Sequence, residues 1–201
     1  MQDWAIRAMQ RWPNVPALFG WLGLDRRGRW LIKGEAISHP RIVAAIAANY
    51  AADAHGRWYF QNGPQRGYIE LEYTPLVLRT TATGDGLVTH TGLSVERAKC
   101  AYLDEEGSVL LDTEHGAGEI AHNDLDWVLQ RLCVENRLLR EDELVDALVL
   151  PTGTETELSL DVGGKRLPVI RLDAAEAPVR LGFVRSPQPR EGEAVSTRAI
   201  D

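Results

Sequence analysis

Hydrophobic and polar residues alternate along much of this sequence, which is the pattern of β-strands with one buried face. The clearest run is YIELEY at residues 68–73, where the set starting at Ile69 would face the core and the set starting at Tyr68 would face solvent. A second alternating pair flanks two glycines within ELSLDVGGKRLPVIRL, residues 157–172, and predicts a hairpin. The chain therefore predicts a strand-rich fold.

Three segments instead carry apolar residues at the spacing of a helix. Residues 39–52 follow Ser38, a residue type that caps helices, and contain Pro40, which fits the first helical turn. The other two segments are residues 124–134 and residues 141–148, the latter with an acidic start that the helix dipole favours. These helices are short.

The order of elements predicts an α+β protein, richer in strand than in helix, made of two small curved-sheet halves with short helices packed on them. The first β-rich half covers residues 24–86, and the second half, with two helices, covers residues 87–185. Residues 1–23 are expected to form an N-terminal helix and an apolar lead-in. Residues 186–201 contain two prolines and many polar groups, and predict a flexible, poorly packed tail.

A short echo supports two similar halves. Leu-Asp-x-x-Gly occurs at residues 24–28 and again at residues 103–107, each time before an apolar strand. The 39–52 helix is expected to pack on the sheet that contains residues 57–79. Alternation and helical spacing assign the core of the first half to Trp30, Ile42, Ile46, Ile69, Leu71 and Val77.

Composition excludes several classes of protein. The chain is 44% hydrophobic and 25% charged, as in ordinary globular proteins, and its net charge of −7 offers no basic surface for nucleic acid or for an anionic membrane. The first residues lack the apolar core of a secretory signal, and no apolar run approaches the roughly 20 residues of a membrane span. Cys100 and Cys133 are isolated and fit buried thiols in a reducing compartment. We therefore expect a cytoplasmic protein without a cofactor.

No familiar enzyme motif is present: the sequence lacks G-x-S-x-G, the phosphate-binding P-loop and H-E-x-x-H. The densest ionisable cluster spans residues 112–124 and includes His115 and His122, which with nearby carboxylates are the ligand types of a divalent metal. No third ligand stands at a recognised spacing, so a solvated acidic loop explains the cluster better than a metal site. Catalysis is not the favoured reading.

The segment WYFQNGPQR, residues 58–66, places aromatic, amide and guanidinium groups around one turn. Its Asn-Gly pair is a strong hairpin signal, and the proline that follows predicts a loop longer than two residues. Aromatic bodies with polar tips suit a groove for a small ligand or a peptide, and an arginine favours carboxylate or phosphate. The predicted ligand-binding residues are Trp58, Tyr59, Asn62, Gln65 and Arg66.

Residues 24–77 also resemble the start of a proteobacterial family of unknown function. The resemblance consists of an Asp-x-x-Gly-x-Trp turn, a helix, a glycine-containing strand, a proline-centred turn and an alternating strand that ends in proline. It implies two halves like pleckstrin-homology domains and a role in signalling or ligand sensing. The matching positions are Asp25, Gly28, Trp30, Gly34, Ile37, Gly56, Pro64, Ile69, Leu71 and Pro75.

Three classes of function stay open. The sequence favours a non-catalytic ligand-sensing or protein-interaction module that takes a small anionic ligand or a peptide. The first alternative is a structural or assembly protein that forms a homodimer through Trp4, Trp12 and a sheet edge. The second alternative is a hydrolase that uses the cluster at residues 112–124.

Overall fold

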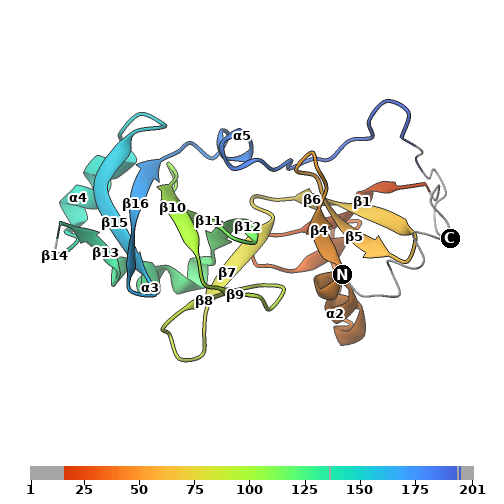
Figure 1. The fold of residues 1–201 in the computed structure, drawn as a ribbon, viewed down its shortest axis with the longest axis horizontal. Coiled ribbons are helices and arrows are strands. Elements are labelled where there is room, and N and C mark those ends of the chain that lie inside the picture. Colours follow the sequence, from red (N-terminus) through yellow and green to blue (C-terminus); the bar gives the residue numbers. More distant parts are fainter. Residues whose placement is uncertain (1–15, 136, 194, 196–201) are drawn as a thin grey trace. The chain divides into compact units, whose positions relative to one another are not determined.

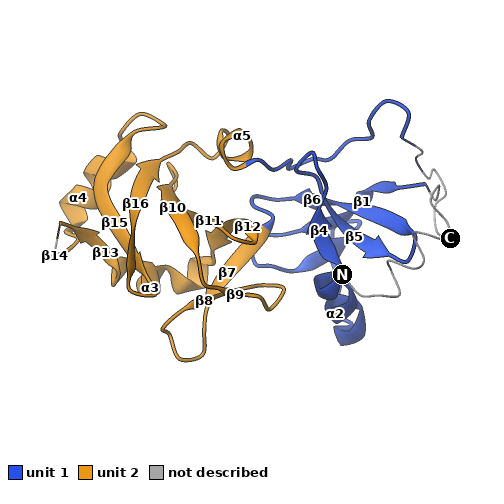
Figure 2. Ribbon diagram, in the orientation of Figure 1, with its two compact units in different colours: residues 1–75, 182–201 blue, residues 76–181 orange. Residues whose placement is uncertain are grey.

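A computed structural model describes residues 16–135, 137–193 and 195 of the chain. The chain folds as two compact units: unit 1 comprises residues up to 75 together with those from 182 onwards, and unit 2 comprises residues 76–181 (Figure 2). The predicted N-terminal helix with Trp4 and Trp12 lies outside the described residues. Within the described part, no helix is both long enough and apolar enough to span a membrane.

Unit 1 contains one six-stranded sheet with the strand order β3-β2-β1-β6-β5-β4 (Figure 1). Neighbouring strands are antiparallel except β1 and β6, which are parallel. In chain order the elements are β1 (Leu18–Leu24), β2 (Trp30–Ile32), β3 (Glu35–Ala36), α2 (Pro40–Ala48), β4 (Tyr50–Ala52), β5 (Trp58–Asn62) and β6 (Gln65–Leu71).

Unit 2 contains one ten-stranded sheet with the strand order β14-β13-β15-β16-β10-β11-β12-β7-β8-β9. Its parallel pairs are β12 with β7 and β10 with β16. The strands are β7 (Leu76–Thr80), β8 (Leu87–Thr89), β9 (Ser94–Val95), β10 (Ala98–Leu103), β11 (Val109–Thr113), β12 (Gly116–Ile120), β13 (Leu132–Val134), β14 (Arg137–Leu138), β15 (Glu155–Val162) and β16 (Lys165–Arg171). The helices are η1 (His122–Asp124), α3 (Leu125–Leu129), α4 (Glu141–Leu148) and α5 (Ala177–Leu181).

Six strands of the unit 2 sheet repeat the strand order of the unit 1 sheet. In unit 1, two three-stranded meanders, β1-β2-β3 and β4-β5-β6, are joined by the parallel pair β1 and β6. In unit 2, β7-β8-β9 and β10-β11-β12 are joined in the same way by β7 and β12. The strand-rich α+β fold is therefore confirmed, and the topology repeats.

The sequence echo marks hairpins that are not equivalent in this repeat. Residues 24–28 connect β1 to β2, whereas residues 103–107 connect β10 to β11, which corresponds to the β4–β5 connection of unit 1. That connection carries the same Asp-x-x-Gly turn at residues 53–56. The Asp-x-x-Gly turn thus occurs in three hairpins: β1–β2, β4–β5 and β10–β11.

The three turns have the same geometry. One carboxylate oxygen of the aspartate accepts backbone N–H groups from the residues two and four positions later, over 2.7–3.1 Å. The glycine has a positive φ, which only glycine adopts readily. The aspartates are Asp25, Asp53 and Asp104, and the glycines are Gly28, Gly56 and Gly107.

The predicted helices are confirmed in part. The helix at residues 141–148 is α4, with the predicted bounds. The helix predicted at residues 39–52 ends earlier, at Ala48, because Tyr50 begins strand β4 and pairs with β5. The helix predicted at residues 124–134 is wrong beyond Leu129, because the chain turns into β13 and pairs with β15.

The predicted hairpins both form, and one prediction of loop length is wrong. Strands β15 and β16 pair antiparallel as the glycine pair indicated. In the β5–β6 hairpin, Asn62 pairs with Gln65, so the loop is the two residues Gly63 and Pro64. A positive φ at Gly63 lets this tight turn close in spite of the proline.

Five of the six predicted core residues are buried: Trp30, Ile46, Ile69, Leu71 and Val77. Ile42 is the exception, with 49% of its surface exposed. Ile46 is the buried residue of α2, so the first turn of the helix with Ile42 extends into solvent.

Tyr68 also departs from the prediction. It was assigned to the solvent face of its strand, yet it is 1% exposed. The Phe19 ring stacks on it at 4.5 Å, and the guanidinium of Arg57 lies 4.5 Å from its ring centre. The polar face of β6 is therefore covered at this position.

The unit boundary and the tail differ from the sequence expectation. The division falls after Pro75 and not near residue 86, and residues from 182 onwards return to unit 1. Within the predicted tail, the backbone carbonyl of Gln188 accepts an N–H of Arg57 at 3.0 Å, and Val195 forms a bridge with Ala17. The described part of the predicted tail is thus bonded to unit 1.

Candidate functional site

The predicted ligand-binding residues lie on the β5–β6 hairpin of unit 1, but they do not share one face of the sheet. Trp58 and Tyr59 are neighbours on β5, and successive side chains of a strand point to opposite faces. Both are buried, at 8% and 5% exposure. At most one of the two rings can therefore lie on any one face of the sheet.

Trp58 belongs to an aromatic cluster in the core. Its ring centre lies 4.7 Å from that of Tyr50, which also contacts Trp30 at 4.8 Å. The Tyr50 hydroxyl donates to the Pro75 carbonyl at 2.9 Å, and burial raises the pKa of Tyr50 well above its ordinary value. Trp58 is therefore buried among the aromatic rings of the core.

Tyr59 lies on the other face, where the guanidinium of Arg66 sits 4.5 Å from its ring centre. The Nε of Arg66 donates to the Gln61 side chain at 3.3 Å. The Gln65 amide donates to a backbone carbonyl just before β1 at 3.1 Å, and Asn62 is exposed. Arg66 thus bonds within the hairpin, Gln65 bonds the hairpin to the segment before β1, and Arg66 is half-buried.

The most highly connected charged group on this face is Arg57, which immediately precedes β5. Its side chain is buried, and its five N–H donors all have acceptors. Nε donates to Asp53 at 2.8 Å, Nη1 donates to the Gln188 carbonyl at 3.0 Å and to Glu193 at 2.8 Å, and Nη2 donates to the Tyr68 hydroxyl at 2.8 Å and to Glu193 at 3.2 Å. The guanidinium thus binds a carboxylate in the two-pronged geometry that arginine favours.

This network shifts the pKa values of the acid groups in it. Burial raises the pKa of Tyr68 to about 12, so its hydroxyl stays protonated as a hydrogen-bond donor. The hydrogen bond from Arg57 lowers the pKa of Glu193. Burial alone would raise the pKa of Asp53, but the N–H groups of His55 and Arg57 lower it below its ordinary value. Both carboxylates are therefore held charged beside the guanidinium.

The same turn at residues 25–30 shows what is particular to Arg57. In Asp25-x-x-Gly-Arg29, the Nε of Arg29 donates to Asp25 at 2.6 Å, as the Nε of Arg57 does to Asp53. The Arg29 side chain is 55% exposed, whereas that of Arg57 is 8% exposed. In both turns the Nε group of the arginine donates to the aspartate. At Arg57, Nη2 also lies 2.8 Å from the Asp53 carboxylate, and Nη1 and Nη2 both donate to the carboxylate of Glu193.

Sequence reasoning missed Arg57, Asp53 and Glu193. A signal for the first two existed, because Asp-x-x-Gly-Arg-Trp occurs at residues 25–30 and again at residues 53–58. Glu193 is separated from Arg57 by 136 residues and sits in a polar segment, so no local pattern identified it.

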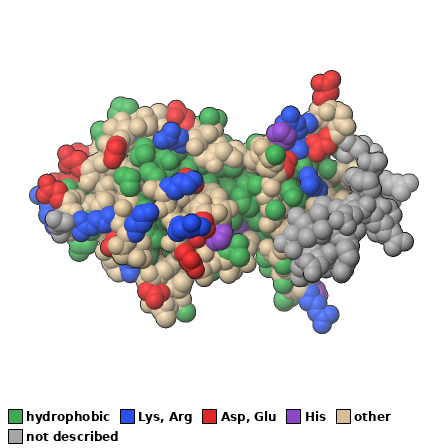
Figure 3. Space-filling view, viewed as in Figure 1, with side chains coloured by type: hydrophobic (Ala, Val, Ile, Leu, Met, Phe, Trp, Pro, Cys, Tyr) green, Lys and Arg blue, Asp and Glu red, His purple; other side chains and the backbone are tan. Residues whose placement is uncertain are grey.

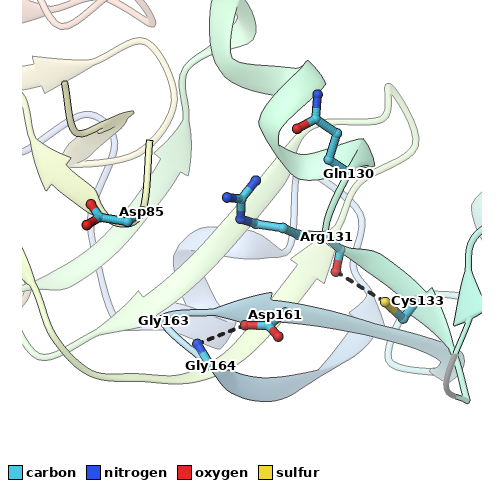
Figure 4. Close-up of a pocket in the computed structure, with 7 residues that line it drawn as sticks. All are labelled: Asp85, Gln130, Arg131, Cys133, Asp161, Gly163 and Gly164. Atoms are coloured by element: carbon cyan, nitrogen blue, oxygen red, sulfur yellow. Dashed lines mark hydrogen bonds between the residues drawn. The ribbon is translucent and has the colours of Figure 1, made fainter. Parts of the chain in front are cut away.

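A cavity of about 560 Å³ lies in unit 2, where the start of β13 meets the β15–β16 turn (Figure 4). Arg131 reaches into it, fixed by the Trp127 ring 4.3 Å away. Asp85 and Asp161 line its walls together with Cys133, a free and half-buried thiol. One cation between two carboxylates gives this cavity no preference for a single class of charged ligand.

The cluster at residues 112–124 does not converge on one point. Asp112 pairs with Lys99 at 3.2 Å, His115 contacts the Ser94 carbonyl at 2.8 Å, and Asp124 accepts from Thr80. Among residues 16–135, 137–193 and 195, no group of histidine, cysteine and carboxylate side chains could hold a metal ion. These side chains instead fix loops and strand ends.

Comparison with protein families matches residues 1–188 to one whose description is "Protein of unknown function (DUF2946)". A solved DUF1285 family protein from Silicibacter pomeroyi DSS-3 is similar in fold, with 14% identity, a TM-score of 0.51, and coverage of 79% of this chain and 85% of that chain. Another from Shewanella baltica OS155 has 15% identity and a TM-score of 0.39, covering 51% of this chain and 85% of its own. No curated protein matches this sequence. The match over residues 1–188 shows that the chain belongs to the family described as "Protein of unknown function (DUF2946)".

Proposed function

We propose that this protein is a non-catalytic binding module whose unit 1 recognises a carboxylate group at Arg57. The observation that carries the proposal is that Arg57 already binds a carboxylate, that of Glu193, from a segment distant in sequence. Glu193 is thus an internal ligand of Arg57, and its carboxylate is the kind of group that we propose the site recognises.

The Asp53 turn supports this role. Asp53 fixes the guanidinium through Nε, so the two Nη groups are oriented before any carboxylate arrives. Tyr68 adds a hydroxyl 3.3 Å from the same Glu193 carboxylate. Arg66, the half-buried residue predicted from sequence, lies on the same face of β5 and β6 and supplies a second cation.

Glu193 and an external carboxylate would compete for Arg57. A tethered group acts at an effective concentration that reaches about millimolar for short flexible links, so the segment around Glu193 would weaken the binding of any free ligand. A ligand would bind measurably when it brings contacts besides the carboxylate, or when the segment is released. The site is then a sensor for an acidic peptide or a small carboxylate.

The test uses the full-length Glu193→Gln variant and a synthetic peptide with the sequence of residues 186–195, measured by calorimetry. We expect the peptide to bind this variant about tenfold or more tightly than it binds the wild-type protein, because the internal competitor is weakened. A peptide with Gln in place of the glutamate at position 193 is the matched control, and it should not bind. Glutarate in a separate titration distinguishes a small-carboxylate site from a peptide site.

The Arg57→Lys substitution, made in the Glu193→Gln variant, tests whether binding requires the paired donors of a guanidinium. Lysine keeps the charge but loses the fork of donors, so binding should fall about tenfold. Equal binding of the glutamate and glutamine peptides would refute the proposal, as would failure of both the glutamate peptide and glutarate to bind.

A further inference from the structure

Glu193 reaches Arg57 at the end of a segment that runs along unit 1, residues 184–193, which we name the return segment (Figure 1). Unit 1 holds the backbone of this segment through hydrogen bonds of 2.8–3.0 Å. The groups of the segment that form them are the N–H of Val184 and the carbonyls of Arg185 and Gln188. Because every residue except proline carries both groups, these bonds fix the path of the segment without selecting its sequence.

Two side chains of the return segment are covered, and each has an exposed neighbour of the same type. Pro187 is buried, whereas Pro189 is exposed. Glu193 has 25% of its side chain exposed in the ion pair with Arg57, whereas Glu191 is exposed. Figure 3 shows basic and acidic side chains gathered on the part of unit 1 along which the return segment runs. Burial thus distinguishes one proline and one glutamate from the other polar and charged positions of the segment.

A turn at residues 190–193 presents the glutamate to the guanidinium. The Glu193 N–H donates to the Arg190 carbonyl at 3.0 Å, and the Arg190 N–H donates to the Glu193 carboxylate at 3.0 Å. Gly192 has a φ of +80°, which is costly for most other residues. A Cβ at this position would meet no atom within 4 Å, so backbone conformation and not lack of space favours glycine here.

We propose that the Arg57 site binds segments of a partner protein with the pattern Pro-x-x-x-x-Gly-Glu, of which residues 187–193 are the internal example. This inference rests on the carboxylate-binding function proposed above and names its ligand as an acidic, proline-containing peptide. The proline is buried without a backbone N–H that would need an acceptor. The glycine closes the turn, and the glutamate accepts the paired donors of the guanidinium. The x positions accept many residues, because their side chains face solvent in the return segment.

The test titrates synthetic peptides into the full-length Glu193→Gln variant by calorimetry, after circular dichroism melting confirms that the variant is folded. The reference peptide has the sequence of residues 186–195. Pro187→Ala in the peptide should weaken binding about tenfold, because it removes two methylene groups that are buried in the complex. Pro189→Ala is the matched control at an exposed proline, and it should weaken binding no more than about threefold.

Two substitutions of Gly192 in the peptide test the turn. Valine is strained at a positive φ and should weaken binding about tenfold, whereas asparagine adopts a positive φ more readily and should stay within about threefold of the reference. A second pair tests the carboxylate. Glu191→Gln should bind about as tightly as the reference peptide, because Glu191 is exposed, and Glu193→Gln should not bind.

The outcomes separate this inference from the function on which it rests. Equal binding of the Pro187→Ala and Pro189→Ala peptides, or of the valine and asparagine peptides, overturns the sequence pattern and leaves carboxylate recognition at Arg57 in place. Binding of glutarate without binding of the reference peptide also overturns this inference alone. If neither glutarate nor the reference peptide binds, the function proposed above fails, and this inference fails with it.

Discussion

Replacing Arg57 by alanine should destabilise unit 1 far more than replacing Arg29 by alanine. Both arginines occupy the same position of the same Asp-x-x-Gly turn and donate through Nε to the turn aspartate. They differ in burial, because the Arg57 side chain is 8% exposed and the Arg29 side chain is 55% exposed. The pair therefore compares a buried arginine that also binds Glu193 with an exposed one in the same local turn.

The expected loss of stability depends on the charged groups that lose their partner when Arg57 is removed. Removal of one partner from a buried ion pair costs about 3–5 kcal/mol, because the other charge stays in a poor solvent. Glu193 has a quarter of its side chain exposed and can regain water, and Asp53 keeps its backbone N–H donors. We therefore expect the lower end, about 3 kcal/mol, for Arg57→Ala. For Arg29→Ala, an exposed pair, we expect about 1 kcal/mol or less.

Urea denaturation followed by tryptophan fluorescence measures this difference. Every tryptophan except Trp127 precedes residue 76, so the signal reports mainly on unit 1. If the dependence of the unfolding free energy on urea concentration is the same in each variant, the shift in the denaturation midpoint gives the change in stability. A loss below about 1 kcal/mol for Arg57→Ala, or equal losses for the two variants, would refute the assignment of Arg57 as the buried centre of the network.

Three further outcomes are expected. Ile46→Ala should cost about 2–5 kcal/mol in denaturation, whereas Ile42→Ala, at a half-exposed position, should cost under about 1 kcal/mol. Gly56→Ala should lower the melting temperature in calorimetry, because its φ is +73° and a Cβ would lie 2.4 Å from the Gly182 carbonyl oxygen. Folding lowers the pKa of Glu193, so the charged carboxylate stabilises the folded protein above its ordinary pKa of about 4.3, and this stabilisation is lost as the pH falls through the folded-state pKa. Urea denaturation at a series of pH values should therefore show a smaller loss of stability in acid for Glu193→Gln than for the wild-type protein.

Local patterns in the sequence determined much of the fold. Alternation located β6 and the β15–β16 hairpin, and helical spacing with an acidic start located α4 at its observed bounds. The Asp-x-x-Gly turns are also determined locally, because their hydrogen bonds form within five residues of the chain. The expected likeness to pleckstrin-homology domains and the ligand-binding role of Arg66 stay predictions.

Tertiary structure decided the burial of individual side chains and the composition of the site. Tyr68 lies on the polar face of its strand by alternation, yet Phe19 and Arg57 cover it. Two identical Asp-x-x-Gly-Arg-Trp turns give one exposed and one buried arginine, because only the second lies where Glu193 returns to the sheet. Sequence periodicity specifies which side of an element a residue faces. What covers that side depends on contacts between segments far apart in the chain, which no local pattern encodes.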